Sequence, residues 1–185
     1  EFDLLIRERS PDGQAYAFID KTMFIKDILS EGAQTILFTR PRRFGKTLNL
    51  SMLQHFFASV VTGRKTDDLF DGLEISRHPE VMRFQGKFPV IFLTLKDIKE
   101  LSWELMLDRL RALMGEMFRE HEYLDSSAVL SEIDKNLFNK YWRNWENLTA
   151  GDVELALPVL MELLYKHHGE RVIVLIDEYD TPIQY

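Results

Sequence analysis

The fold class of the chain is indicated most clearly by one stretch, Ile36-Leu37-Phe38-Thr39-Arg40-Pro41-Arg42-Arg43-Phe44-Gly45-Lys46-Thr47. Residues 35–39 are a short run of β-branched and aromatic residues, which predicts a buried strand. Behind the loop, apolar residues recur at helical spacing from Leu48 to Val60. Strand, loop and helix in this order form the frame in which proteins build loops that hold phosphate groups.

The last residues of this stretch carry the chemistry of such a loop. Gly45 lets the backbone turn because it has no Cβ, and Lys46 places a positive charge within reach of the outer phosphates. Thr47 offers a hydroxyl to Mg²⁺ at the first turn of the helix, whose free N–H groups and dipole attract an anion. The expected nucleotide-binding residues are Arg42, Arg43, Phe44, Gly45, Lys46, Thr47 and Leu48.

The phosphate-loop pattern G-x-x-x-x-G-K-[ST] is incomplete here, because Arg40 stands where the pattern has its first glycine. The alternative interpretation is a Gly-Lys-Thr that only caps a helix after a buried strand. Arg40, Arg42, Arg43 and Lys46 nevertheless concentrate positive potential where a polyphosphate would lie. The sequence leaves open whether Arg42 and Arg43 clamp phosphate or face a protein partner.

Composition narrows the class of protein. The 185 residues have the length of one domain, and a hydrophobic content of 45% is enough for a sizeable core. A net charge of -7 argues against wrapping nucleic acid, so nucleic acid is expected as an indirect partner only. The absence of cysteine excludes disulfides and thiolate metal sites and indicates a reducing compartment. Apolar runs are too short to cross a membrane, so we expect a cytoplasmic chain without a membrane partner.

The chain is expected to form one domain over residues 1–185. Residues 1–30 predict a lead-in: a charged loop, a strand-like run at Tyr16–Ile19, and a helix that Asp20 caps and Gly32 ends. We interpret Asp20-Lys21-Thr22 as helix capping rather than as a ligand site. Residues 31–185 predict the nucleotide-binding core.

Within the core, residues 87–95 form a nearly continuous apolar run, which is typical of a strand in a parallel sheet flanked by helices. Amphipathic helices are expected over residues 100–122, from Ser127 to about Phe138, and over 152–168, with Pro158 inside the last. An aromatic group is expected in the core or at a domain contact rather than as a base-stacking platform: Phe138, Tyr141, Trp142 and Trp145.

The second half of the site follows a third apolar strand, residues 172–176, which ends in Asp177 and Glu178. In a parallel sheet, ligands collect at the carboxyl ends of the strands, so Asp177 and the loop after Thr39 are expected at the same edge. Asp177 can hold Mg²⁺, and Glu178 can orient and deprotonate an attacking water. Two motifs of complementary charge in the right order argue for a nucleotide site.

Four segments resemble a known family: Asp20-Lys21-Thr22, residues 39–52 with Arg-Pro-Arg-Arg-Phe-Gly-Lys-Thr, Gly86-Lys87-Phe88-Pro89-Val90, and residues 176–183 from Ile176-Asp177-Glu178 onward. They look like the AAA-ATPase-like domain of bacterial proteins. The resemblance implies a P-loop NTPase of the additional-strand, catalytic-glutamate division, an α/β three-layer sandwich with a mostly parallel sheet. It implies ATP and Mg²⁺ as cofactors, Thr47 and Asp177 as metal ligands, and Glu178 as the catalytic residue.

The resemblance also sets expectations beyond residue 185. In that division the strand with the sensor residue follows the Asp-Glu strand, which implies that the C-terminal strands of the sandwich lie outside this chain. Many members carry a PD-(D/E)XK nuclease-like domain after the ATPase, so a downstream effector of this kind, or a protein partner, is expected. An oligomer is left open.

The function that these observations favour is a Mg²⁺-dependent ATP-binding domain that hydrolyses ATP and couples nucleotide state to an effector. One alternative is a nucleotide-sensing interaction module with little hydrolysis, because a Cβ at Arg40 hinders the approach of backbone to phosphate. Another is a phosphotransferase. The adjacent Asp177 and Glu178 suit the activation of water better than the binding of an acceptor.

Overall fold

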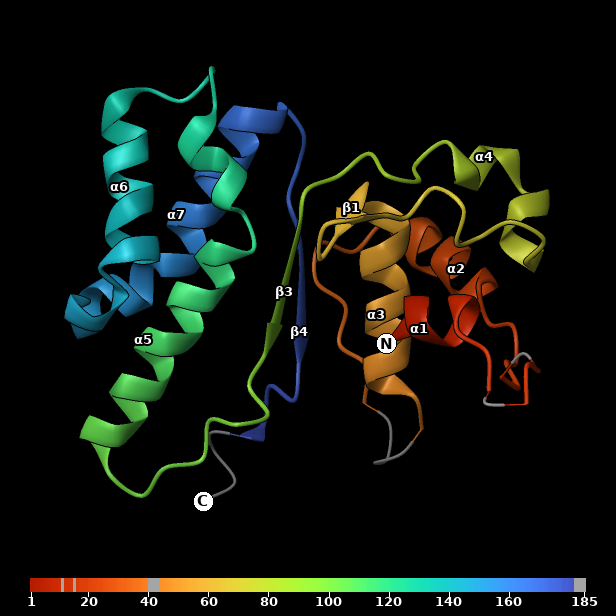
Figure 1. The fold of residues 1–185 in the computed structure, drawn as a ribbon, viewed down its shortest axis with the longest axis horizontal. Helices are drawn as coiled ribbons and strands as arrows, with labels where there is room; N and C mark the ends of the chain where they lie inside the picture. Colours follow the sequence, from red (N-terminus) through yellow and green to blue (C-terminus); the bar gives the residue numbers. More distant parts are fainter. Residues whose placement is uncertain (11, 15, 40–43, 182–185) are drawn as a thin grey trace. The chain divides into compact units, whose positions relative to one another are not determined.

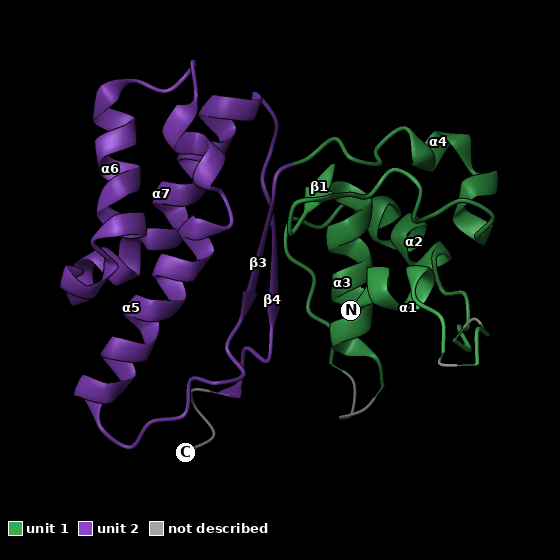
Figure 2. Cartoon of the chain, in the orientation of Figure 1, with its two compact units in different colours: residues 1–88 green, residues 89–185 purple. Residues whose placement is uncertain are grey.

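A computed structural model describes residues 1–10, 12–14, 16–39 and 44–181. The chain divides into two compact units, residues 1–88 and residues 89–185, and each is described by itself (Figures 1 and 2). The architecture is mixed α/β with a small parallel sheet. In these described ranges, no helix combines the length and the apolar character needed to cross a membrane.

Unit 1 is built from helices and one short hairpin. Its elements are α1 (Phe2–Arg7), α2 (Met23–Glu31), α3 (Lys46–Phe57), β1 (Val60–Val61), β2 (Arg64–Lys65), the 3-10 helix η1 (Glu74–Arg77) and α4 (Pro79–Met82). The predicted helices before Gly32 and after the loop are confirmed as α2 and α3, and Gly32 ends α2 in the left-handed conformation. Val60, expected in the helix, lies in β1 instead.

The N-terminal residues form a helix where a loop was predicted. Phe2 of α1 is fully buried, and its ring stacks on Phe70 at a centroid distance of 5.2 Å. Phe70 in turn meets Phe56 of α3 edge to face at 5.1 Å. Packing of this aromatic core therefore stabilises a six-residue helix that would be marginal in isolation.

Two predicted strands of unit 1 are absent from the described residues. Neither residues 16–19 nor residues 35–39 are strands, and Leu37 is 64% exposed. Phe38 packs its ring on Phe24 of α2, with a centroid distance of 5.0 Å. The prediction of a buried strand at residues 35–39 is therefore wrong: a strand needs a neighbour for its backbone hydrogen bonds, and no described strand supplies one.

Unit 2 combines two parallel strands with a helical layer. Its elements are β3 (Val90–Thr94), α5 (Trp103–Arg119), η2 (Glu122–Ser126), α6 (Glu132–Arg143), η3 (Trp145–Asn147), α7 (Ala150–His168) and β4 (Ile173–Asp177). Strands β3 and β4 pair in parallel, from Val90 opposite Ile173 to Thr94 opposite Asp177. The prediction of two parallel strands at these positions is confirmed, as are the helices at α5, α6 and α7, the last of which continues through Pro158.

The core of unit 2 lies between the sheet and helices α5, α6 and α7. Ile91 and Leu93 of β3 are part of it, and the rings of Phe118 and Tyr141 stack at 4.6 Å. The aromatic group around Phe138 is therefore core, as predicted. Ser131 and Thr149 begin α6 and α7 with capping boxes, each closed by an Asp three residues later.

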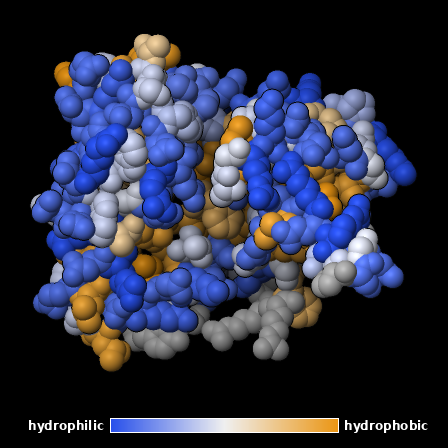
Figure 3. All heavy atoms as spheres, viewed as in Figure 1, coloured by the Kyte–Doolittle hydropathy of each residue, from blue (hydrophilic) through white to orange (hydrophobic). Residues whose placement is uncertain are grey.

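The outer surface of these helices is mainly polar. In Figure 3, hydrophilic residues cover most of the visible surface over α5 and α6, and an apolar group lies at the lower left, where α5 begins in Figure 1. Leu101 and Trp103, at that end of α5, are 98% and 63% exposed. Helices α5 and α6 thus turn their apolar faces to the core along most of their length.

Candidate functional site

The cationic half of the site lies at the beginning of α3. Gly45 is the N-terminal cap residue, with a left-handed φ of 74° that disfavours any side chain. Lys46 and Thr47 are the first helical residues. Lys46 is half-buried, and its ammonium group forms no ion pair with a described residue. The free N–H groups of a first helical turn attract anions, and Lys46 adds a positive charge to this turn.

The structure describes only some of the other residues predicted for this half of the site. Phe44 is described and is 61% exposed, and Leu48 is half-buried in the first turn of α3. Arg42 and Arg43, together with Arg40, lie outside the described residues. Their predicted roles on phosphate stay predictions.

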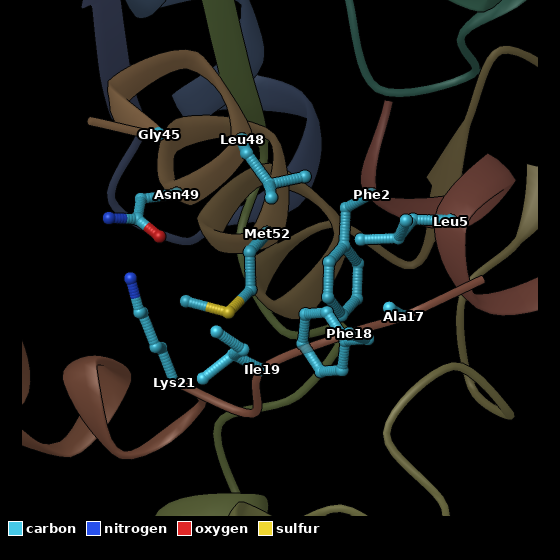
Figure 4. A pocket seen from close by; sticks show the side chains of 10 residues that line it. All are labelled: Phe2, Leu5, Ala17, Phe18, Ile19, Lys21, Gly45, Leu48, Asn49 and Met52. Atoms are coloured by element: carbon cyan, nitrogen blue, oxygen red, sulfur yellow. The ribbon is translucent and has the colours of Figure 1, made fainter. Parts of the chain in front are cut away.

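A cavity of about 210 Å³ opens beside Gly45, entirely within unit 1 (Figure 4). Its walls are mainly apolar and come from α1, the segment before α2, and α3: Phe2, Leu5, Ala17, Phe18, Ile19, Leu48 and Met52. Two polar side chains, Lys21 and Asn49, complete the lining. An apolar hollow with a few polar groups next to a helix N-terminus is suited to a ligand that has both an apolar and a charged part.

Asp20 and Thr22 hold the segment that carries Lys21. The Asp20 carboxylate accepts hydrogen bonds from the Thr22 N–H at 2.8 Å, from the Thr22 hydroxyl at 2.7 Å, and from the Glu74 N–H at 2.7 Å. Burial alone would raise the pKa of Asp20, but these N–H groups outweigh it and lower the pKa below its ordinary value. Thr22, not Asp20, is the cap residue of α2, so the capping prediction was wrong about the position. Asp20 instead ties the start of α2 to η1.

Helix α1 is fixed against α3 by buried polar contacts. The Phe2 N–H donates to the Ser51 hydroxyl at 3.1 Å, and the Asp3 carboxylate lies 3.5 Å from Nε2 of His55. Nδ1 of His55 lies 2.7 Å from the Ser51 carbonyl oxygen. Burial lowers the pKa of His55, although the Ser51 carbonyl and Asp3 act in the opposite direction. These contacts hold Phe2 and Leu5 in the cavity wall, so α1 belongs to the candidate site.

The acidic half of the site lies at the carboxyl end of β4 in unit 2. Asp177 is 5% exposed, and its Oδ1 accepts a hydrogen bond from the Glu178 N–H at 3.1 Å. Glu178 has a φ of 52°, a left-handed conformation that costs a non-glycine residue roughly 1–2 kcal/mol. Such strain often occurs at active sites, where surrounding contacts enforce it. Here the Glu178 carbonyl accepts a hydrogen bond from the N–H of Thr181 at 3.0 Å, which closes the turn.

Thr94 is a neighbour of Asp177 that the sequence prediction missed. It is the last residue of β3 and the register partner of Asp177, so both lie at the same edge of the parallel sheet. The available signal was the expected parallel pairing itself, because the residue that ends the neighbouring strand must lie at that edge. A threonine hydroxyl there adds a polar group beside the carboxylate.

Asp177 and Thr47, the residues predicted to hold a metal ion, are oxygen donors of the type that magnesium binds. Across the described ranges, no three or more histidine or acidic side chains form a group that could hold a metal ion. Mg²⁺ at nucleotide sites takes one or two carboxylates and completes its octahedron with waters and phosphate oxygens. A single strand-end carboxylate, Asp177, and the hydroxyl of Thr47 are ligands of that kind. They belong to different units, and the structure describes each by itself.

Comparison with known proteins gives the family. Residues 10–185 match the AAA-ATPase-like family, described as predicted AAA-ATPases. The chain belongs to this family. The matched range includes both the Gly45-Lys46-Thr47 helix start and the Asp177-Glu178 strand end. Membership of the AAA-ATPase-like family supports nucleotide binding.

A relative of this AAA-ATPase-like chain is a protein from Azotobacter chroococcum mcd 1, described as an uncharacterized protein in the vnfD 5' region. The two are 28% identical over 179 residues, which are 93% of this chain and 27% of the relative. The chain therefore spans little more than a quarter of that protein. No solved structure matches the chain.

Proposed function

We propose that this member of the AAA-ATPase-like family binds ATP with Mg²⁺ and hydrolyses it. The observation that carries the proposal is the start of α3, where left-handed Gly45 precedes Lys46 and Thr47 beside an apolar cavity. The cavity, about 210 Å³, lies below the range of about 300–1,000 Å³ usual for sites that enclose a whole drug-sized ligand. It suits a nucleoside whose phosphates extend outward to the helix start.

Each predicted residue then has a role. Backbone N–H groups of residues 42–47 hold the phosphates, with Arg42 and Arg43 as additional contacts, and Lys46 meets the β- and γ-phosphate oxygens. Thr47 and Asp177 hold Mg²⁺, which when bound neutralises the charge that develops on the phosphates. Glu178 orients the attacking water and accepts its proton. In this proposal residues 31–185 are the nucleotide-binding core of a three-layer P-loop sandwich, and residues 1–30 are its lead-in.

Hydrolysis would serve to switch an effector, and a nuclease-like domain is the effector that the resemblance suggests. The rival proposal is a nucleotide-sensing module, in which binding alone transmits the signal. The adjacent Asp177 and Glu178 favour hydrolysis, because a carboxylate beside the proposed metal ligand can accept the proton of the attacking water.

The test is Glu178→Gln, measured for MgATP binding by calorimetry and for phosphate release. We expect ATP affinity close to wild type and hydrolysis reduced by about 10²–10⁴-fold, because the amide cannot accept the proton of water. The matched control is Glu170→Gln, an exposed glutamate of the same unit, which should change neither quantity. Equal hydrolysis by Glu178→Gln and wild type would remove Glu178 from the mechanism. Tight binding without measurable hydrolysis by the wild type would favour the sensing module.

A further inference from the structure

In unit 2, the connection between α5 and α6 meets the end of α7 through a cluster of histidines around one tyrosine. One side consists of η2 with its two cap residues, His121 and Ser127, and the other side consists of His167 and His168 at the end of α7. The Tyr123 ring of η2 has centroid distances of 5.8 Å to His121, 5.4 Å to His167 and 5.8 Å to His168. In the described structure, the two hydrogen bonds that cross this junction both end on a histidine ring. Their state can therefore change close to neutral pH.

The hydrogen bonds of Ser127 show which form of His167 fits the junction. The Ser127 hydroxyl oxygen accepts the N–H groups of Val129 at 3.2 Å and Leu130 at 3.3 Å. Its own proton is then left for Nδ1 of His167, 2.7 Å away. Nδ1 accepts this proton only if it carries none itself, so the contact requires a neutral imidazole.

A second chain of hydrogen bonds runs through the Tyr123 hydroxyl, which lies 3.3 Å from Nδ1 of His121 and 2.9 Å from Nε2 of His168. Burial raises the pKa of Tyr123 to about 12, so its hydroxyl keeps its proton. Nε2 of His121 is buried without a partner in the described structure, and an unpaired N–H there would be the costlier form. Nδ1 of His121 therefore donates to Tyr123, and Tyr123 donates to an unprotonated Nε2 of His168.

No carboxylate among the described residues pairs with these imidazoles. Ionisable groups of the adjoining elements pair with one another instead: Arg119 with Glu116 on α5, Asp125 of η2 with Arg143 of α6, and Lys166 of α7 with Asp134 and Glu162. Glu122, Glu170 and Arg171 are exposed. A positive charge in the cluster would thus have no counter-charge.

The pKa values of the cluster agree with this arrangement. Burial, and after it His167, lowers the pKa of His168, while burial, and after it His168, lowers the pKa of His121 to about 4. Burial and Glu116 raise the pKa of Glu120, the neighbour of His121 in sequence, to about 7. Glu120 therefore loses its charge as the pH falls and does not balance a protonated histidine.

We propose that His121, Tyr123, His167 and His168 form a proton-operated latch, which closes η2 onto α7 when the imidazoles are neutral and opens when they are protonated. His168 is exposed, so a proton reaches it directly. A proton on its Nε2 removes the acceptor of Tyr123, and the acceptor that remains among the described residues, Nδ1 of His121, already carries a proton. His121 could free Nδ1 only by placing a proton on its buried Nε2, so the contact opens instead.

The position of the latch gives it a structural consequence. The chain leaves α7 at Gly169 and enters β4 a few residues later. The latch therefore fixes the end of the helix that leads into this strand. The inference does not depend on nucleotide binding and goes beyond the proposed function.

The experiment is amide hydrogen exchange of the whole chain at pH 7 and pH 5, expressed as protection factors that correct for the intrinsic effect of pH. The reporters are the amides of Leu124 and Ser127, which donate to carbonyl groups within the η2 segment. An imidazole that is neutral in the closed latch and has its ordinary pKa of about 6.5 in the open one favours opening about 30-fold at pH 5. Protection of both amides should therefore fall by at least about tenfold between pH 7 and pH 5.

Low concentrations of urea distinguish local from global opening. Exchange of Leu124 and Ser127 should hardly respond to urea, because opening the latch exposes little surface, whereas exchange of the buried Met117 in α5 should accelerate. An equal response of all three amides would show global unfolding and overturn the latch.

Two variants test the histidines themselves. His168→Gln keeps an oxygen that accepts from Tyr123, and neither it nor His121→Gln can take up a proton, so each should show a smaller fall in protection than wild type. His78→Gln, at a histidine of unit 1, is the matched control and should behave as wild type. Equal protection of wild type at pH 7 and pH 5 would overturn the proposal. A wild-type fall in both His121→Gln and His168→Gln would overturn it as well, because other groups would then cause the opening.

Discussion

Residues 35–39 and strand β4 are two similar runs of sequence with different structures. Both are rich in β-branched and apolar residues, and both lead into a predicted ligand-binding turn. Strand β4 pairs with β3 over five register positions, whereas residues 35–39 pair with no described strand and leave Leu37 64% exposed. Composition therefore predicts the apolar character of a segment, but the backbone becomes a strand only where a neighbour completes its hydrogen bonds.

The two halves of the candidate site differ in the same way. At the start of α3, neighbours in sequence create the site, because Gly45, Lys46 and Thr47 need only the first turn of their own helix. At the end of β4, Asp177 is placed by a partner strand more than seventy positions earlier in the chain, where Thr94 lies opposite it. The acidic half should accordingly be the more sensitive to mutations in its surroundings.

The first prediction sharpens this contrast through stability. Ile91→Ala removes a fully buried side chain of β3 from the core of unit 2 and should lower the free energy of unfolding by about 2–5 kcal/mol. Leu37→Ala, in the unpaired and exposed segment, should change it by less than about 0.5 kcal/mol. Urea unfolding measures both. Similar losses for the two variants would mean that residues 35–39 are packed as firmly as β3.

The second prediction concerns the stability of unit 2 at acidic pH. His121 is 7% exposed, and its Nε2 atom is buried without a hydrogen-bond partner in the described structure. Burial lowers the pKa of His121 from 6.5 to about 4, and His168 lowers it by a smaller amount. Since the unfolded chain binds the proton first, stability should be lost as pH falls from 6.5 to 4. The contribution of His121 to this loss should be about 3 kcal/mol, while Glu120, whose pKa burial raises to about 7, contributes in the opposite direction over the same range.

The measurement is the free energy of unfolding across that pH range. His121→Phe should flatten the decline, whatever its own stability at neutral pH, because it removes the titrating group. An unchanged slope in His121→Phe would show that other groups cause the acid sensitivity.

The third prediction has the smallest effect and tests the strain at the acidic half. Glu178→Gly should raise the free energy of unfolding by about 1 kcal/mol, because glycine adopts the φ of 52° without strain, and should abolish hydrolysis. Thr62, in the turn between β1 and β2, is the matched control, since its φ is 48°. Thr62→Gly should give a similar gain with hydrolysis unchanged. If Glu178→Gly destabilised the protein, the side chain of Glu178 would be contributing more to the fold than its conformation costs.

The elements that sequence could predict are those with a strong local period. Helices α2, α3, α5 and α7 and strands β3 and β4 follow from helical or apolar patterns and from stops such as Gly32. Helix α1 was missed because Phe2 is stabilised by Phe70, a residue far along the chain. The strand at residues 35–39 was predicted wrongly, because its composition says nothing about a partner strand.

The residues of the candidate site also differ in whether a local sequence pattern predicts them. Lys46, Thr47, Asp177 and Glu178 could be predicted as site residues because each belongs to a short motif. The cavity was not, since its walls come from α1, residues 17–21 and α3, and only the packing of these segments brings Lys21 near Asn49. Contacts between separate segments of this kind leave no periodic signal in a sequence.

The most direct test of the central claim is a calorimetric titration of wild type and Lys46→Ala with MgATP. Lys87→Ala, an exposed lysine of the same unit, is the control. The account predicts that wild type and Lys87→Ala bind ATP and that Lys46→Ala loses at least about a hundredfold in affinity, as expected when a charged hydrogen-bond partner of the phosphates is removed. The melting temperature should not change, because Lys46 pairs with no described residue. ATP binding by Lys46→Ala as tight as wild type would contradict the assignment of the start of α3 as the phosphate site.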